Sequence, residues 1–222
     1  MKRRRIQTRV RGQPTSDGAG VRLSRVIGTR NLPDLDPFLM LDEFGSEIGA
    51  DYIAGFPDHP HRGFETVTIM LNGSMHHQDH LGNSGYLRDG SVQWMTAGRG
   101  IIHSEMPEQT EGLMRGFQLW VNLPASLKMC EPRYQDIAPE KIPTLRKGES
   151  NLRIIAGRVD DTIGPIEGIV THPILLDIGF DADDHLDLEL PDSHRAFVYC
   201  YEGEIEIEDQ RLETGVLGVL DR

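Results

Sequence analysis

The segment that decides the fold runs from residue 59 to residue 71 and reads His-Pro-His-Arg-Gly-Phe-Glu-Thr-Val-Thr-Ile-Met-Leu. Residues i and i+2 of a strand point to the same face, so the imidazoles of His59 and His61 can reach one metal ion together. Pro60 restricts the backbone between them, which lowers the entropy cost of holding the pair. Counted by twos, the same face becomes apolar toward residue 71. The pattern therefore predicts the interior face of a β-barrel, with chemistry at one end.

A second unit with the same spacing, His103-Ser104-Glu105, follows the glycine-rich turn at residues 96–100. Together the two units offer three imidazoles and one carboxylate, a mixed nitrogen and oxygen set that suits Fe(II). Mn, Ni, Cu and Zn fit the same donors less selectively. The structural alternative is that Glu105 pairs with an arginine such as Arg99 and that His103 caps a turn.

Short β-rich runs recur along the whole chain between glycine-rich turns. The 222 residues include 24 Gly and 13 Pro, more breakers than a helical bundle carries. Hydrophobic residues make up 38% and charged residues 26%, which excludes a disordered tail or a fibre. The sequence therefore predicts an all-β fold. Strands are expected at residues 67–71, 92–95, 117–121, 152–156, 174–178, 186–190, 197–201 and 204–208.

The chain is long enough for one large or two small domains. Residues 124–148 combine prolines with mixed charge, which is typical of a linker with one short helix. We therefore expect a metal-binding N-terminal domain over residues 1–130 and a second domain over residues 131–222.

Charge and cysteine content narrow the partners and the compartment. The formal net charge of −12 repels phosphate backbones, so nucleic-acid binding is disfavoured, although residues 1–12 are basic. Cys130 and Cys200 form no CxxC pattern, as is usual in a reducing compartment. The sequence has no run of 18 apolar residues, and no apolar core follows the basic start. We expect a cytoplasmic protein without a membrane segment.

Four longer stretches carry a resemblance to a known family. The chain is similar to the signatures of the pirin family at residues 36–44, 59–66, 93–107 and 118–124. The resemblance implies a bicupin, with two β-barrel (jelly-roll-like) domains and one Fe(II) ion per chain in the first. Carried over position by position, the metal ligands would be His59, His61, His103 and Glu105. Ordinary cupins often use the glutamate of their first motif as a ligand. In this chain that glutamate is Glu65, which would be structural.

The resemblance also implies an activity of the quercetin 2,3-dioxygenase type, in which O₂ opens the ring of a flavonol or a related phenolic substrate. In that scheme Glu105 would be the catalytic residue that accepts the hydroxyl proton, besides binding the metal. The alternative is a non-enzymatic, iron-binding redox sensor that binds transcription factors or metabolic enzymes. The acidic charge favours such a protein partner over DNA. A third interpretation is a cupin that binds no metal, but the presence of four suitable ligands disfavours it.

A substrate pocket is expected beside this centre, with Gln118, Phe44, Phe56 and Glu65 as its candidate residues. Gln118 lies in the middle of an apolar strand, and a buried amide needs partners that a water or a substrate would provide. Trp94 and Met95 are expected in the core. His77 and Asp79 follow the turn at Gly73 and are expected on the rim of the site.

The second half should echo the first if the chain is a bicupin. Aligning residues 197–201 with residues 67–71 sends the positions of His59, His61 and Glu65 to Glu189, Pro191 and Arg195. None of these is a histidine, and an arginine repels a cation, so the second domain should bind no metal. The same alignment sends His103 beyond Arg222. We therefore expect the second barrel to be incomplete at its C-terminus.

Overall fold

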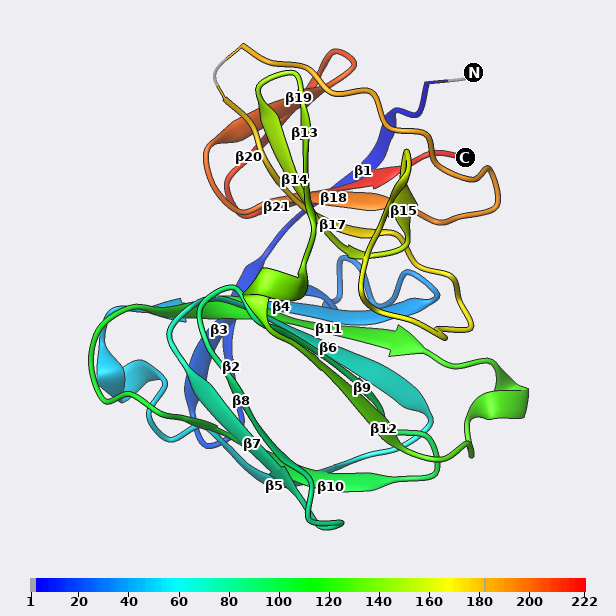
Figure 1. The fold of residues 1–222 in the computed structure, drawn as a ribbon. Helices are drawn as coiled ribbons and strands as arrows, with labels where there is room; N and C mark the ends of the chain where they lie inside the picture. The colour runs from blue at the N-terminus through cyan, green and yellow to red at the C-terminus, as the bar shows by residue number, and fades with distance from the viewer. Residues whose placement is uncertain (1–2, 182) are drawn as a thin grey trace.

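The computed structural model describes residues 3–181 and 183–222, and these form mainly β-strands and the loops between them. Figure 1 shows two β units, and the first and last strands of the described chain both lie in the second unit. The described residues also form three single-turn 3₁₀ helices, η1 (Gly49–Asp51), η2 (Ala125–Leu127) and η3 (Pro139–Lys141). None of these helices has the length and apolar character needed to cross a membrane. The predicted all-β fold is confirmed.

The N-terminal unit consists of a larger and a smaller antiparallel sheet that face each other (Figure 1). The larger sheet contains β2 (Gln13–Asp17), β3 (Val21–Ile27), β4 (Phe38–Ser46), β6 (Phe64–Asn72), β9 (Val92–Thr96), β11 (Met114–Asn122) and β12 (Arg133–Ile137). The smaller sheet contains β5 (Phe56–His61), β7 (Met75–Asp79), β8 (Ser84–Leu87) and β10 (Ile101–Pro107). Their spatial orders are β12-β9-β6-β11-β4-β3-β2 and β5-β10-β7-β8.

The C-terminal unit has two three-stranded sheets and two hairpins. The first sheet combines β1 (Ile6–Arg11), β21 (Val216–Leu220) and β18 (Phe197–Cys200), in that order. The second combines β13 (Thr144–Lys147), β14 (Ser150–Ala156) and β17 (Leu175–Gly179). The hairpins pair β15 (Arg158–Val159) with β16 (Thr162–Ile163), and β19 (Glu204–Ile207) with β20 (Gln210–Glu213).

Two strands belong, by their pairing, to the unit that lies at the other end of the chain. Strand β1 opens the described chain but pairs with β21 of the second unit, with Ile6 opposite Leu220. Strand β12 lies beyond residue 130 but pairs with β9 of the N-terminal unit, with Tyr134 opposite Met95. The domain limits 1–130 and 131–222 stay a prediction. We propose that strand pairing, rather than chain order, defines the two units.

Most of the expected strands are present. Residues 67–71, 92–95 and 117–121 fall inside β6, β9 and β11, and the C-terminal runs form β14, β17, β18 and β19. The strand expected at residues 186–190 is wrong, because these residues belong to no strand. Burial does alternate there, and Leu186 and Leu188 pack against a cluster of buried side chains. The alternation of apolar and polar residues thus indicated burial correctly, but a strand also needs a neighbouring strand with which it can pair.

The largest core lies between the larger sheet and the C-terminal unit. Val67 and Ile69 of β6 belong to the same buried cluster as Ile155 and Leu217 of the second unit. A separate cluster, which includes Phe44, Met70 and Met75, lies in the interior of the N-terminal unit. The two units therefore share hydrophobic stabilisation.

This arrangement corrects the prediction that one face continues from the two histidines to residue 71. The histidines lie on β5, and Gly63, with φ near 80°, turns the chain before β6 begins. Only glycine adopts that backbone angle without strain. As a result, Val67 faces the second unit, and Thr68 points to the interior.

Candidate metal centre

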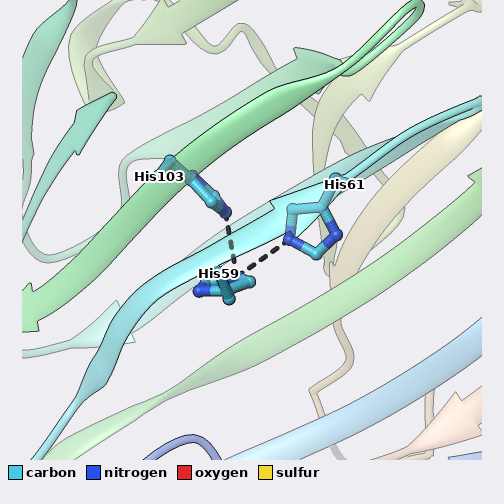
Figure 2. A group of neighbouring side chains, drawn as sticks. All are labelled: His59, His61 and His103. Carbon is cyan, nitrogen blue, oxygen red and sulfur yellow. Dashed lines mark hydrogen bonds between the residues drawn. The ribbon is translucent and has the colours of Figure 1, made fainter. Parts of the chain in front are cut away.

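Three histidines meet inside the N-terminal unit (Figure 2). His59 and His61 lie on β5, and His103 lies on the neighbouring β10, directly opposite His59 in the ladder. The Nε2 atom of His59 is 2.9 Å from Nε2 of His61 and 3.1 Å from Nε2 of His103. One ring nitrogen of each residue lies within 4.8 Å of the other two. The predicted pair and the third imidazole therefore form one cluster that could hold a metal ion.

The turn before β10 sets the position of His103. Gly98 has φ near 52°, and a side chain there would collide with the carbonyl of Cys130. The ladder between β10 and β5 then shifts register between His103 and Glu105. Such a bulge re-aims the side chains that follow it.

Burial keeps His61 and His103 uncharged. It lowers the pKa of both His61 and His103 to about 3, and the neighbouring imidazoles add to the effect. Neutral imidazoles are the form that binds metal ions. Nδ1 of His59 lies 2.8 Å from the carbonyl oxygen of Pro57 and, as the donor, leaves its Nε2 lone pair facing the other two rings. Only one of the other two rings can donate a hydrogen bond to the Nε2 lone pair of His59. A cation between the three nitrogens would instead be bound by all of them, so these residues fit a metal ion.

These pKa values predict the acid sensitivity of the metal-free protein. The pKa of histidine in the unfolded chain is about 6.5, so below that pH the unfolded chain binds protons that the folded chain does not bind. The free energy of unfolding should fall by about 1.4 kcal/mol per pH unit for each of His61 and His103 as the pH drops from 6.5 toward 3. Urea unfolding at several pH values measures the slope. The variant His61→Gln should remove about half of that slope. An unchanged slope in His61→Gln would contradict the assignment.

Glu105 is also buried and lies two residues beyond His103 on β10. Its carboxylate accepts hydrogen bonds from Thr68 Oγ1 at 3.1 Å and from Gln118 Nε2 at 3.1 Å. It is not part of the close three-nitrogen cluster, but it lines the same cavity as His59 and His61. The role of Glu105 as a fourth ligand stays a prediction.

A cavity of about 430 Å³ opens beside the histidines. Of the residues expected there, Gln118, Phe44 and Phe56 line it. Glu65 does not line it: it shares the face of Val67, accepts a hydrogen bond from Thr96 at 2.7 Å, and has a pKa raised by burial. Glu65 is therefore separated from this cavity by the sheet.

Some residues lie elsewhere than expected, and others went unnoticed in the sequence. Trp94 and Met95 are buried, as predicted. His77 lies deeper than the rim, because β7 pairs with β10 and places His77 opposite Glu105. Thr68 and Trp120 also line the cavity. Both alternate with apolar residues that face the second unit, so the period of two in β6 and β11 was the signal that could have found them.

Comparison with known proteins identifies the family of this chain. A family model described as Pirin matches residues 20–121. A protein of Pseudomonas aeruginosa named "Putative quercetin 2,3-dioxygenase" is 56% identical over 205 residues, which is 90% of this chain and 72% of that protein. The human protein named pirin is 40% identical over 226 residues, which cover 97% of this chain and 75% of that protein.

Solved structures give the same result. The crystal structure of a quercetin 2,3-dioxygenase from Acinetobacter baumannii matches 99% of this chain and 80% of its own, with a TM-score of 0.88 and 32% identity. The Escherichia coli pirin YhhW in complex with nickel(II) matches with a TM-score of 0.60 at 19% identity, a likeness in fold alone. Two β units with a buried histidine cluster in the first define a bicupin. The chain belongs to the pirin family, and the resemblance predicted from its sequence is confirmed.

Proposed function

We propose that this protein is a metal-dependent dioxygenase of the quercetin 2,3-dioxygenase type, which acts on a flavonol or a related phenolic with O₂. The observation that carries the proposal is the juxtaposition of three imidazoles and a buried carboxylate at a cavity open to solvent. The cavity volume, about 430 Å³, lies within the range of roughly 300–1,000 Å³ that small-molecule sites occupy.

The metal would be held by His59, His61 and His103, with Glu105 as the proposed fourth ligand. One Fe(II) ion per chain suits this donor set, and Mn, Ni, Cu or Zn also fit it. When bound, the ion would act as a Lewis acid for the phenolic oxygen and supply the redox chemistry that O₂ needs.

The chain's own residues would prepare the substrate. The Glu105 carboxylate would accept the proton of the reacting hydroxyl, while Thr68 and Gln118 hold that carboxylate in place. The rings of Phe44 and Phe56 line the cavity and would contact the flat phenolic rings. Substrate would thus be oriented by apolar contact on its rings and by polar contact at one edge.

The test is oxygen consumption by the iron-loaded protein with quercetin, against a His59→Ala control whose iron content is measured on the same samples. We expect uptake that rises with bound iron and is lost in the control, because His59 supplies the nitrogen nearest to both others. Full iron occupancy without uptake would overturn the enzymatic proposal. That result would favour an iron-binding redox sensor for a protein partner, consistent with the net charge of −12. The cytoplasm remains our proposed compartment, because Cys130 and Cys200 are both free thiols.

A further inference from the structure

The two sheets of the N-terminal unit leave two seams where their edge strands meet without pairing. Strands β2 and β5 end their sheets at one seam, and β12 and β8 end them at the other. The cavity beside the histidines opens at the first seam, where Asp17 and Ala19 lie across from Phe56. A second cavity of about 470 Å³ opens at the other seam and is lined by His77, Asn83, Ser84, Pro132, Tyr134 and Asp136.

A row of polar side chains on the larger sheet joins the two cavities. Asp136 on β12 is opposite Gln93 on β9, and Gln93 is opposite Thr68 on β6. Thr68 is opposite Gln118 on β11. Residues directly opposite each other in a ladder point to the same face, so all four face the interior. The row thus begins at the second cavity and ends at the first.

The facing sheet supplies a matching pair, because His77 on β7 is directly opposite Glu105 on β10. Hydrogen bonds link the row at both ends. At the second cavity, Asp136 accepts from Gln93 Nε2 at 2.9 Å and lies 3.2 Å from Nε2 of His77. At the first cavity, Thr68 and Gln118 donate to Glu105.

Several buried polar atoms of this interior make no hydrogen bond to the described residues, and two of them, Gln93 Oε1 and His77 Nδ1, belong to side chains that contact Asp136. Gln93 and His77 are each 1% exposed. Buried polar atoms are nearly always bonded, to the protein or to ordered water. Gly85 lets His77 and Asp136 lie close to β8, because a side chain there would collide with both.

We propose that the seam between β8 and β12 is a second entrance, for water, and that a hydrated passage runs from it past Gln93 to Glu105. Its role rests on the proposed function: water could then reach and leave the carboxylate while a phenolic substrate fills the first cavity. The passage itself requires neither metal nor substrate, so it is tested on the metal-free protein.

The direct test is a crystal structure at a resolution that shows ordered water. We expect waters bonded to Gln93 Oε1 and His77 Nδ1, continuing toward the carboxylate of Glu105. A dry interior, in which these two atoms bond to protein groups instead, would overturn the proposal.

A solution test uses hydrogen peroxide, a polar probe close to water in size. Thr68→Cys places a reporter thiol in the middle of the row, in a background where Cys130→Ser and Cys200→Ala remove the natural thiols. Ala19→Trp obstructs the first seam and Asn83→Trp the second, since both residues are exposed and line the two cavities. The rate of thiol oxidation is followed by mass spectrometry, and the urea midpoint of each variant checks its fold.

If water enters at both seams, Ala19→Trp alone should leave the reporter reactive. Adding Asn83→Trp should slow oxidation by about tenfold or more, since a closed interior reacts only through rare opening of the fold. If Ala19→Trp alone slowed oxidation as much as the double obstruction, the second entrance would not exist. Pro132→Trp is a second obstruction at the same seam if Asn83→Trp fails to fold. Failure of oxygen uptake with quercetin would leave either result intact.

Discussion

Replacing His61 with alanine should abolish stoichiometric metal binding and leave most of the fold intact. His61 is 5% exposed, and its Nε2 lies 2.9 Å from that of His59, so it supplies one of three converging nitrogens. The remaining two imidazoles would form an open site of much lower affinity. Metal content after loading and gel filtration, together with far-ultraviolet circular dichroism, measures both halves of the prediction.

The matched control is Glu65→Gln. Glu65 stands where ordinary cupins often place a ligand, but here its carboxylate points to the other face of the sheet and accepts a hydrogen bond from Thr96. A glutamine keeps the size of the side chain and a carbonyl acceptor, so this variant should bind metal like the parent. Undiminished metal in His61→Ala, or loss of metal in Glu65→Gln, would show that the histidine cluster is not the metal site.

The second large effect is expected from Trp94→Ala, which should lower the free energy of unfolding by about 3–5 kcal/mol. Trp94 is 1% exposed and belongs to the cluster that contains Val67 of the first unit and Ile155 of the second. Removing the indole leaves a cavity where the two units meet, and close-packed interiors fill such cavities only in part. Urea unfolding, monitored by circular dichroism, gives the change.

Tyr86→Ala is the control for that measurement. The Tyr86 ring is stacked on His76 at the surface, and the residue is 68% exposed, so its loss should change stability by about 0.5 kcal/mol or less. A Trp94→Ala variant no less stable than Tyr86→Ala would mean that the shared core does not stabilise the two units together. Two separate transitions in the parent protein would lead to the same conclusion.

The three-histidine cluster was predictable because its chemistry is local. The spacing of His59 and His61 requires only that the segment be extended, and the glycine-rich turn before His103 is visible in the sequence. Most strands were predictable for a similar reason, since β-branched runs between turns favour the extended state wherever they pair. The long motifs then indicated the family and, through it, the bicupin fold.

The predictions that failed depended either on the turn at Gly63 or on contacts between distant segments. The turn at Gly63 separates β5 from β6, so the histidines and Val67 do not share one face as a period of two had indicated. His77 is buried because β7 pairs with β10, a register that no local pattern specifies. Residues 186–190 have a strand-like pattern, but their backbone joins no ladder.

The amino-acid sequence by itself determined that the chain is an all-β protein with a three-histidine cluster, because residue type and spacing encode local conformation and donor chemistry. The tertiary structure alone decided which face each strand buries, where β1 and β12 pair, and which polar residues meet inside. Those features follow from register and from the packing of one unit on the other. Register is a relation between segments far apart in the chain, so it exists only once they are folded together.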